Sequence, residues 1–247
     1  MDTATTIALS RLMAQQRAMD VVADNIANTG TPGYRAQRMM FADFLVRQPL
    51  GGRTKGEPTL AYTQDMATWR DTRPGALSHT GNPLDLAIGD QSGYFTVKAA
   101  AGPRLTRSGH FTANASGQVV DAEGNALLDN AGQPIALSPS DTDLTVTADG
   151  TLASQNGPIA KIGVVSPQDA TRLTPEGNRL ARADTPTTAT ANPHLVQGAV
   201  EESNVQAVSE TTHMMDMLRE FQFVTQFVQG RADMQSQAID KLSQRPA

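Results

Sequence analysis

The chain contains no cysteine among its 247 residues. Disulfide bonds, thiol catalysis and cysteine-based zinc sites are therefore excluded, while oxidising and reducing compartments both stay open. Aromatic residues make up only 4% of the chain, with a single tryptophan. A single large packed core is therefore not expected, and several thin modules fit this composition better.

The chain also lacks a basic block and a long apolar run, and its first residues do not predict a leader. Its net charge is −5, from 20 basic and 25 acidic residues. Phosphate binding needs clustered lysine and arginine, so we expect no nucleic-acid partner. No stretch approaches the ~20 apolar residues that span a bilayer, so direct membrane insertion is not expected. Residues 1–6 have neither the basic region nor the apolar run of a signal peptide. We therefore expect any export to proceed without a cleaved leader.

Motifs that carry chemistry are missing as well. The four histidines do not stand at metal-ligand spacing, and the chain has no Gly-x-Ser-x-Gly elbow, phosphate-binding loop or dinucleotide fingerprint. Asp85 would be catalytic only with a partner base, and none stands at a telling distance in the sequence. We therefore predict no catalytic residue, metal site or cofactor, and no enzymatic activity.

The strongest positive signal lies at the two ends. Residues 4–28 and 203–243 both carry heptad-like apolar repeats, which predict helices of about 36 Å and 60 Å at 1.5 Å per residue. Gly230 interrupts the second repeat and weakens that helix by about 1 kcal/mol. The first apolar set is Ala8, Leu12, Met19, Val22 and Ile26, and the second is Val205, Val208, Met215, Leu218, Phe221, Val228, Ala232, Ile239 and Leu242. Such ends indicate assembly, although most apolar stripes simply face a core of their own chain.

A turn is predicted directly after the first helix. Asn28 or Gly30 can adopt the left-handed conformation that ends a helix, and Pro32 with Gly33 suits the centre of a type II turn. Asn28, Pro32 and Gly33 form a predicted structural corner. Tyr34 and Arg35, which follow it, are candidates for exposed contacts only.

The middle of the chain predicts β structure. Leu84, Leu86 and Ile88 alternate with Asp85 and Ala87, and glycines then punctuate the sequence at 109, 117, 124 and 132. This spacing is typical of a β-meander or small barrel with short strands. For residues 39–46 the pattern allows either a short helix or an extended strip.

The predicted class is therefore α+β, with terminal helices forming a coiled-coil-like module and a central all-β domain that is a meander or a small barrel. The expected divisions are an N-terminal helix over 1–34, an extended connector over 35–80, a β-rich outer domain over 81–180, a connector over 181–202 and a C-terminal helix over 203–247.

Three passages resemble one known family. They are residues 22–35 (VADNIANTGTPGYR), residues 81–111 (GNPLDLAI, then GYF, then LTRSGHF), and residues 201–221 (EESNV, leading to Met214 and REF). In order and spacing they resemble the flagellar rod and hook proteins of bacteria. The likeness is greatest to the proximal rod member, on the length and on residues 72–77 (TRPGAL). The distal rod member is the alternative.

The resemblance implies an inner shell of paired terminal helices and an outer β-rich domain. It implies passage in unfolded form through the flagellar type III export apparatus without a cleaved signal. It further implies helical polymerisation, with copies of itself and other rod subunits, into the basal-body rod that crosses the periplasm and transmits torque for motility. The expected contact residues between subunits are Leu12, Met19, Val22, Ile26, Val205, Leu218, Phe221 and Val228.

Two functions of other classes stay open at this point. One is a secreted β-rich hydrolase whose turnover depends on Asp85 or His110. The other is a monomeric surface-binding module with ordered ends. A rod subunit instead predicts protease-labile ends around a resistant middle of roughly residues 80–180, because unpartnered segments open easily.

Overall fold

The computed structural model describes residues 3–47, 59–177 and 179–243. The chain divides into two compact units. The helical unit comprises Met1–Ala27, Gln37–Trp69 and Gln206–Ala247, and the β unit comprises Asn28–Ala36 and Arg70–Val205. Helices at both ends and a β-rich centre confirm the predicted α+β class.

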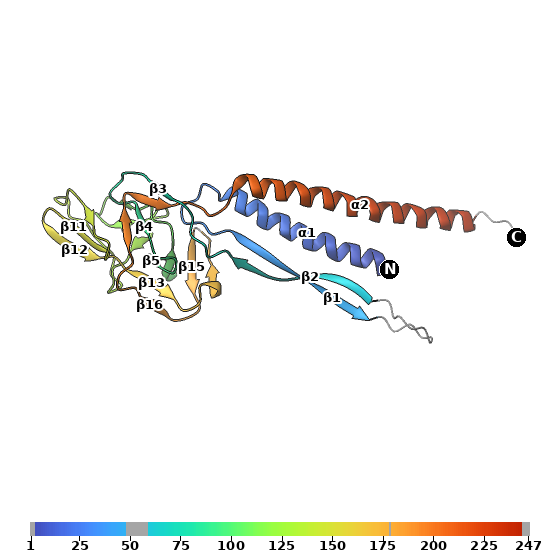
Figure 1. Cartoon of the computed structure of the whole chain (residues 1–247), viewed down its shortest axis with the longest axis horizontal. Coiled ribbons are helices and arrows are strands. Elements are labelled where there is room, and N and C mark those ends of the chain that lie inside the picture. The colour runs from blue at the N-terminus through green and yellow to red at the C-terminus, as the bar shows by residue number, and fades with distance from the viewer. Residues whose placement is uncertain (1–2, 48–58, 178, 244–247) are drawn as a thin grey trace. The chain divides into compact units, whose positions relative to one another are not determined.

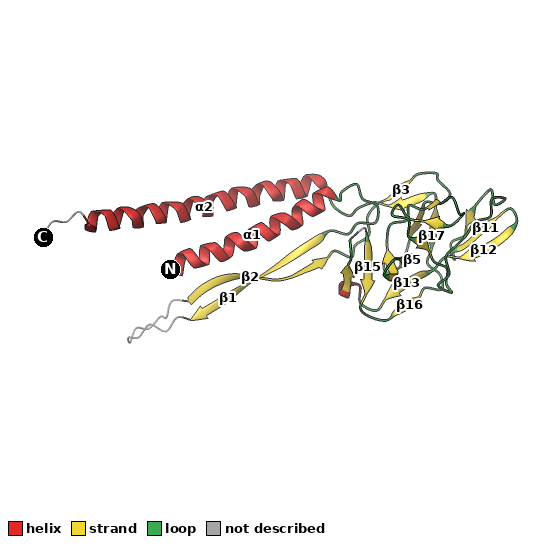
Figure 2. Cartoon of the chain, turned by 180° about the vertical axis from the view of Figure 1, so that it is seen from behind, coloured by secondary structure: helices red, strands yellow, loops and turns green. Residues whose placement is uncertain are grey.

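The helical unit contains two helices and a pair of strands. Helices α1 (Thr3–Ala27) and α2 (Ala207–Ser243) lie side by side and run in opposite directions in both views (Figures 1 and 2). Strands β1 (Gln37–Arg47) and β2 (Thr59–Arg70) form a two-stranded sheet. Residues 39–46, for which the sequence allowed a helix or an extended strip, lie in β1. Residues 37–47 and 59–70 of the segment expected to be a connector are thus paired strands, in keeping with the high β propensity of its Phe, Val and Tyr residues.

Small side chains of α1 are buried within the helical unit. Ala8, Ala14 and Ala18 of α1 are buried, and Ala18 packs with Val22 and Met217. Because the distance between packed helices depends on the side chains at the contact, these alanines permit a close approach. The buried line on α1 therefore differs from the expected one, which contained neither Ala14 nor Ala18.

The β unit contains short strands in several sheets. A nine-stranded sheet has the order β14-β15-β6-β5-β9-β8-β7, with β13 paired to β5 and to β16. The other sheets are β10-β11-β12, β17-β4 and β18-β3. The bounds are β3 Leu77–His79, β4 Leu86–Ile88, β5 Tyr94–Ala99, β6 Gly102–Thr106, β7 Thr112–Ala113, β8 Val119–Val120, β9 Ala126–Leu127, β10 Thr145–Val146, β11 Thr151–Ser154, β12 Gly157–Lys161, β13 Val164–Pro167, β14 Leu173–Pro175, β15 Leu180–Ala183, β16 Thr187–Ala189, β17 Leu195–Gln197 and β18 Ala199–Glu201, with a 3₁₀ turn at Ala170–Arg172.

The β unit extends beyond the range expected for it. Strands β16, β17 and β18 lie in the segment expected to be a connector, and each pairs with an earlier strand. Val196, for example, stands opposite Ala87, and Val200 stands opposite Ser78. The partners of β17 and β18 lie more than a hundred residues away in the sequence, so no local pattern could indicate this pairing.

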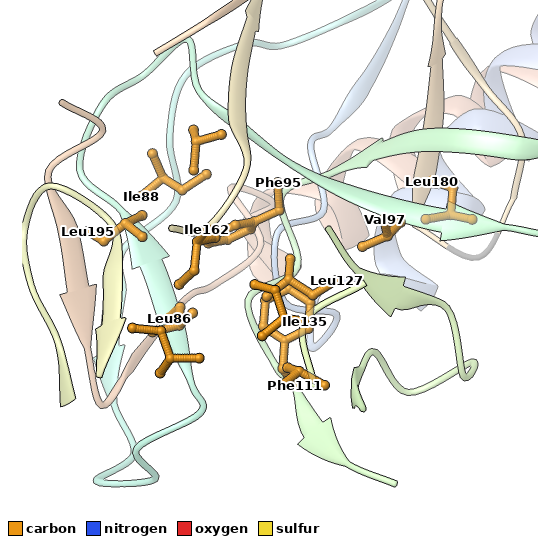
Figure 3. Packing of buried hydrophobic residues seen from close by; sticks show 13 residues of the cluster. Leu86, Ile88, Phe95, Val97, Phe111, Leu127, Ile135, Ile162, Leu180 and Leu195 are labelled. Atoms are coloured by element: carbon orange, nitrogen blue, oxygen red, sulfur yellow. The ribbon is translucent and has the colours of Figure 1, made fainter. Parts of the chain in front are cut away.

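The core of the β unit is one cluster of apolar side chains (Figure 3). Phe95 and Phe111 are both 0% exposed and meet edge to face, with ring centroids 5.3 Å apart at 88°. Leu127 and Ile135 belong to the same cluster, as Figure 3 shows. Edge-to-face contact is the favoured geometry of such rings and adds to the stabilisation from burial.

Gly109 differs from the other three punctuating glycines. Gly117, Gly124 and Gly132 have φ between 78° and 87°, as a left-handed turn residue requires. Gly109 instead lies against a strand: its carbonyl accepts a hydrogen bond from the Leu86 amide at 2.9 Å, and a Cβ placed on it would stand 1.6 Å from the Leu86 carbonyl oxygen. Close approach of two backbones, and not a turn, therefore requires glycine here.

Candidate functional site

One face of α2 is covered within its own unit. The buried or half-buried positions recur at intervals of four and three, which places them on one side of the helix. They are Glu210, Met214, Met217, Phe221, Val224 and Val228.

Ion pairs fix the elements of the helical unit to each other. Arg38 on β1 donates to the Glu210 carboxylate of α2 at 2.7 Å, and Glu210 is only 2% exposed. Arg11 of α1 pairs with Glu220 of α2 at the surface. An exposed pair of this kind contributes little, whereas a buried carboxylate such as Glu210 strongly requires its partner.

The remaining surface of the helices carries large apolar side chains. On α1, Leu9 and Met13 are 55% and 52% exposed. On α2, Phe223 and Phe227 are 71% and 51% exposed and lie one turn apart. The exposed set on α2 is Val208, Met215, Leu218, Phe223, Phe227, Met234 and Ile239. We call these nine side chains of both helices the exposed apolar set.

A groove lies where α2 passes the beginning of α1. Its volume is about 600 Å³, and Thr5 of α1 lines it together with Phe227, Val228 and Met234 of α2. A Cβ placed on the nearby Gly230 would meet nothing within 4 Å. The helix surface here is therefore open enough to accept a further apolar element.

The eight expected contact residues fall into three groups. Val22 and Val205 are 4% and 8% exposed within their own chain, and Val205 precedes α2 in the β unit. Leu218 is 44% exposed. The other five are half-buried: Leu12, Met19, Ile26, Phe221 and Val228. Sequence reasoning did not single out Phe223 and Phe227. They are four residues apart and lie outside the main apolar stripe, and this spacing was the available signal of a second apolar surface.

The chain turns sharply after α1. The Thr31 amide donates to the Asn28 carbonyl at 3.2 Å, and the Tyr34 amide donates to the Thr31 carbonyl at 3.2 Å, so Pro32 and Gly33 stand at the centre of the second turn. Gly33 has φ of 71°, the left-handed conformation that position three of a type II turn needs. A Cβ on Gly33 would lie 2.4 Å from the backbone of Arg107, so the site excludes any larger residue.

A buried carboxylate holds the start and the end of the β unit together. Glu201 is 2% exposed, and its carboxylate accepts hydrogen bonds from Arg35 at 3.1 Å and from Arg107 Nε at 2.9 Å. Its carbonyl also accepts the Gly33 amide at 2.7 Å. Arg35 is 4% exposed, so the expectation that it makes exposed contacts is wrong. Its partner Glu201 lies 166 residues away, and no local signal connects them.

Two asparagines substitute for missing strand partners. The side-chain oxygen Oδ1 of Asn204 accepts a hydrogen bond from the Ala36 backbone amide at 2.7 Å. The side-chain nitrogen Nδ2 of Asn204 donates to the Asp71 and Arg73 carbonyls at 3.2 and 2.9 Å. The Asn25 side chain, which is 0% exposed, bonds both the amide and the carbonyl of Gln37 at 2.9 Å. The side chains therefore pair backbone groups that would otherwise be buried without a partner.

Replacing Asn25 with alanine is expected to lower the free energy of unfolding of the helical unit by about 1–3 kcal/mol, because both backbone groups of Gln37 lose their partner. Urea denaturation followed by circular dichroism at 222 nm measures the change. Gln16→Ala, at an exposed amide on the same helix, is the matched control. Equal effects of the two substitutions would contradict this role of Asn25.

Asp85 and His110 form the pair that the sequence did not reveal. His110 Nδ1 lies 2.7 Å from Asp85 Oδ1, and Asp85 is further held by Thr80 at 2.6 Å and by Asn82 at 3.1 Å. Among the described residues, no hydroxyl or thiol is bonded to the other nitrogen of His110, as nucleophilic catalysis would require. Asp85 and His110 also stand opposite each other in a β-bridge between two backbone segments, so the side-chain contact holds these two segments together.

The described ranges hold neither a metal-ligand cluster nor a membrane-spanning helix. Those ranges contain no group of three or more His, Asp or Glu side chains able to hold a metal ion. None of their helices combines the length and the apolar character needed to cross a membrane.

Three family models match the chain in succession. Residues 6–35 match the flagella basal body rod protein family, residues 89–154 match the flagellar hook protein FlgE/F/G D1 domain, and residues 196–241 match the flagellar basal body rod FlgEFG protein C-terminal family. The flagellar basal-body rod protein FlgF of Caulobacter vibrioides is 32% identical over 247 residues, which cover 98% of both chains. The chain belongs to the flagellar basal-body rod protein family. The resemblance stated from the sequence is thereby confirmed.

Further relatives agree with this family. FlgF of Rhizobium meliloti is 33% identical over 246 residues, covering 98% of both chains, and FlgG of Agrobacterium fabrum is 29% identical over 262 residues, covering 94% of this chain and 97% of the relative. In this rod-family protein the first matched segment ends at Arg35 and the third contains Glu201. The buried ion pair therefore joins the two segments by which the family is recognised.

Proposed function

We propose that this rod-family protein is a structural subunit of the flagellar rod that assembles with copies of itself and with other rod subunits through the exposed apolar set of its helices. The observation that carries the proposal is the pair Phe223 and Phe227. They remain 71% and 51% exposed on a helix whose other face is already covered. Exposed apolar patches on a soluble surface mark interaction sites.

The arrangement of the helices suits a filament. Contacts between different faces of successive copies repeat without closing, which produces a helical polymer and not a ring. In such a polymer, the open groove beside Phe227 and the exposed part of α2 would receive helices of neighbouring subunits and complete a coiled-coil-like seam. Helices that interlock along their length resist sliding, so the polymer can transmit torque.

The finer placement follows the resemblance. We place the subunit in the proximal rod, with the distal rod as the alternative, and we propose that it crosses to the periplasm through the flagellar export apparatus without a cleaved leader. The absence of cysteine accords with export of the chain in unfolded form, because no disulfide has to form. Of the eight contact residues expected from the sequence, Leu218 stays in the proposed interface as an exposed member.

Replacing Phe227 with glutamate is expected to abolish swimming when the variant is the only copy in the cell, because a charge would have to be buried in the interface. The monomer should keep its stability within about 0.5 kcal/mol, since Phe227 is exposed. Swimming in soft agar and recovery of the subunit in isolated basal bodies measure the effect. Gln226→Glu, at an exposed neighbouring position, is the control and should swim normally. Normal swimming of F227E would refute the proposed interface.

A further inference from the structure

A small cavity in the β unit is walled by arginines. Its volume is about 30 Å³, and Arg35, Arg70, Arg107 and Arg179 line it together with Tyr94. The backbone turn at Gly33 and strand β6 form other parts of the wall. Cationic groups of this number around a small space demand a corresponding set of anions.

The described carboxylates do not supply that set. Arg179 pairs with Glu123, while Arg35 and Arg107 share the single carboxylate of Glu201. Asp71, which also lines the cavity, is engaged by Arg73, whose Nε donates to it at 2.9 Å. Arg70 has no carboxylate within ion-pair distance among the residues that the structure describes.

Two buried donors in this wall also lack an acceptor among the described residues. Nε of Arg35 and Nε of Arg70 are shielded from solvent and have no hydrogen-bond partner in the described part of the chain. Arg35 as a whole is 4% exposed, so water does not reach it freely. Buried donors in native proteins are almost always satisfied by protein groups, ordered water or a ligand.

The shifted pKa values of the arginines in the cavity wall also favour a bound anion. Burial lowers the pKa of Arg70, and the effects of Tyr34 and Tyr94 oppose the shift. Burial also lowers the pKa of Arg107, where Glu201 opposes the shift and the charge of Arg35 adds to it. An anion between these guanidinium groups would reverse both effects, because it favours their charged forms.

Size and shape select the ligand. A water molecule needs about 10–15 Å³ by the same measure of volume, so the cavity admits a group of only a few heavy atoms. A planar carboxylate matches the fork of a guanidinium group and can accept two parallel hydrogen bonds from it. We propose that this cavity is a carboxylate-binding site, in which Arg70 with Arg35 and Arg107 holds either a free small carboxylate or the acidic side chain of an adjoining subunit.

Binding of a free carboxylate can be measured on the full-length chain. Arginine side chains labelled with ¹⁵N are followed by NMR while sodium acetate is added, with sodium chloride at matched ionic strength as the reference. Acetate should shift the Nε–H signals of Arg70 and Arg35 to saturation, and chloride should not. Equal, unsaturated shifts in the two salts would overturn the proposal.

Variants make the titration specific. Arg70→Gln should weaken the acetate effect on the Arg35 signal at least tenfold. Arg70→Lys keeps the charge without the fork, and it should also weaken the effect. Arg172→Gln, at an exposed arginine that does not line the cavity, should bind as the unaltered chain does. An R70Q chain that retains its backbone spectrum and binds acetate normally would overturn the proposal.

A swimming test in cells distinguishes the two sources of the carboxylate, and this experiment rests on the proposed rod function. If R70Q abolishes swimming while R172Q does not, an acidic side chain of an adjoining subunit occupies the site. If R70Q swims normally, the occupant is a free carboxylate. Failure of the rod proposal would show in the Phe227 variant, whereas failure of the carboxylate site would show in the titration, so the two are distinguishable.

Discussion

Replacing Glu201 with alanine is expected to lower the free energy of unfolding of the β unit by about 3–5 kcal/mol. The carboxylate is 2% exposed and serves two arginines that are each 4% exposed. Without it, Arg35 and Arg107 remain as two positive charges in a low-dielectric surrounding, with backbone carbonyls and, for Arg107, the Tyr94 ring as partners. Removing one member of a buried ion pair costs more than the pair contributes, because the remaining charge stays uncompensated.

Hydrogen exchange in increasing urea, read by mass spectrometry on peptides from β5 and β6, measures the stability of the β unit alone. Glu201→Gln keeps the shape but loses the charge, so its effect should lie between those of alanine and the unaltered chain. Glu202→Ala is the matched control, since Glu202 is the adjacent residue and is exposed. If E201A and E202A have the same small effect, the buried carboxylate does not hold the unit together.

This ion pair illustrates what the sequence could not reveal. Arg35 and Glu201 both belong to passages that carry the family resemblance, yet each is an ordinary charged residue in its local context. Charged side chains are usually exposed, which is why Arg35 was expected at the surface. Their burial depends on a contact between segments 166 residues apart, and only the folded chain brings them together.

The helices were predictable in existence and type, and less so in the face that packs. A repeat of threes and fours over 25 residues in α1 and 37 residues in α2 is a strong helical signal. The contact itself uses Ala18, and Ala14 is also buried; such small side chains contribute little to an apolar stripe read from large ones. Phe223 and Phe227 stay outside the buried face for the complementary reason: no large surface of their own unit is available to cover them.

The β unit was predictable from its turns more than from its strands. Glycine spacing indicated short strands connected by turns, and Gly117, Gly124 and Gly132 have the left-handed φ that such turns need. The last strands of the unit, β16 to β18, are only three residues long, and β17 and β18 pair with strands more than a hundred residues earlier. Long-range pairing decides their conformation, so propensity alone placed them in a connector.

Replacing Phe111 with alanine is expected to lower the free energy of unfolding of the β unit by about 3–5 kcal/mol. The ring is 0% exposed and meets Phe95, which is held on the central strand β5 between β6 and β9. Because paired neighbours fix β5, the surrounding side chains cannot collapse into the space that the ring leaves. The cavity therefore persists, and its cost adds to the lost transfer energy of the ring.

The same urea series of hydrogen exchange measures this effect, with Leu77→Ala as the control at an apolar side chain that is 46% exposed in the same unit. Phe111→Leu should cost clearly less than alanine, because leucine refills most of the volume and loses mainly the edge-to-face contact, worth about 0.5–1.5 kcal/mol. The loss of stability should be largest for Phe111→Ala, smaller for Phe111→Leu and smallest for the control. This order follows only if one rigid core determines the stability of the unit. A Phe111→Ala chain that unfolds like Leu77→Ala would mean that the nine-stranded sheet stays stable without this core, and that its other contacts are enough to hold the β unit.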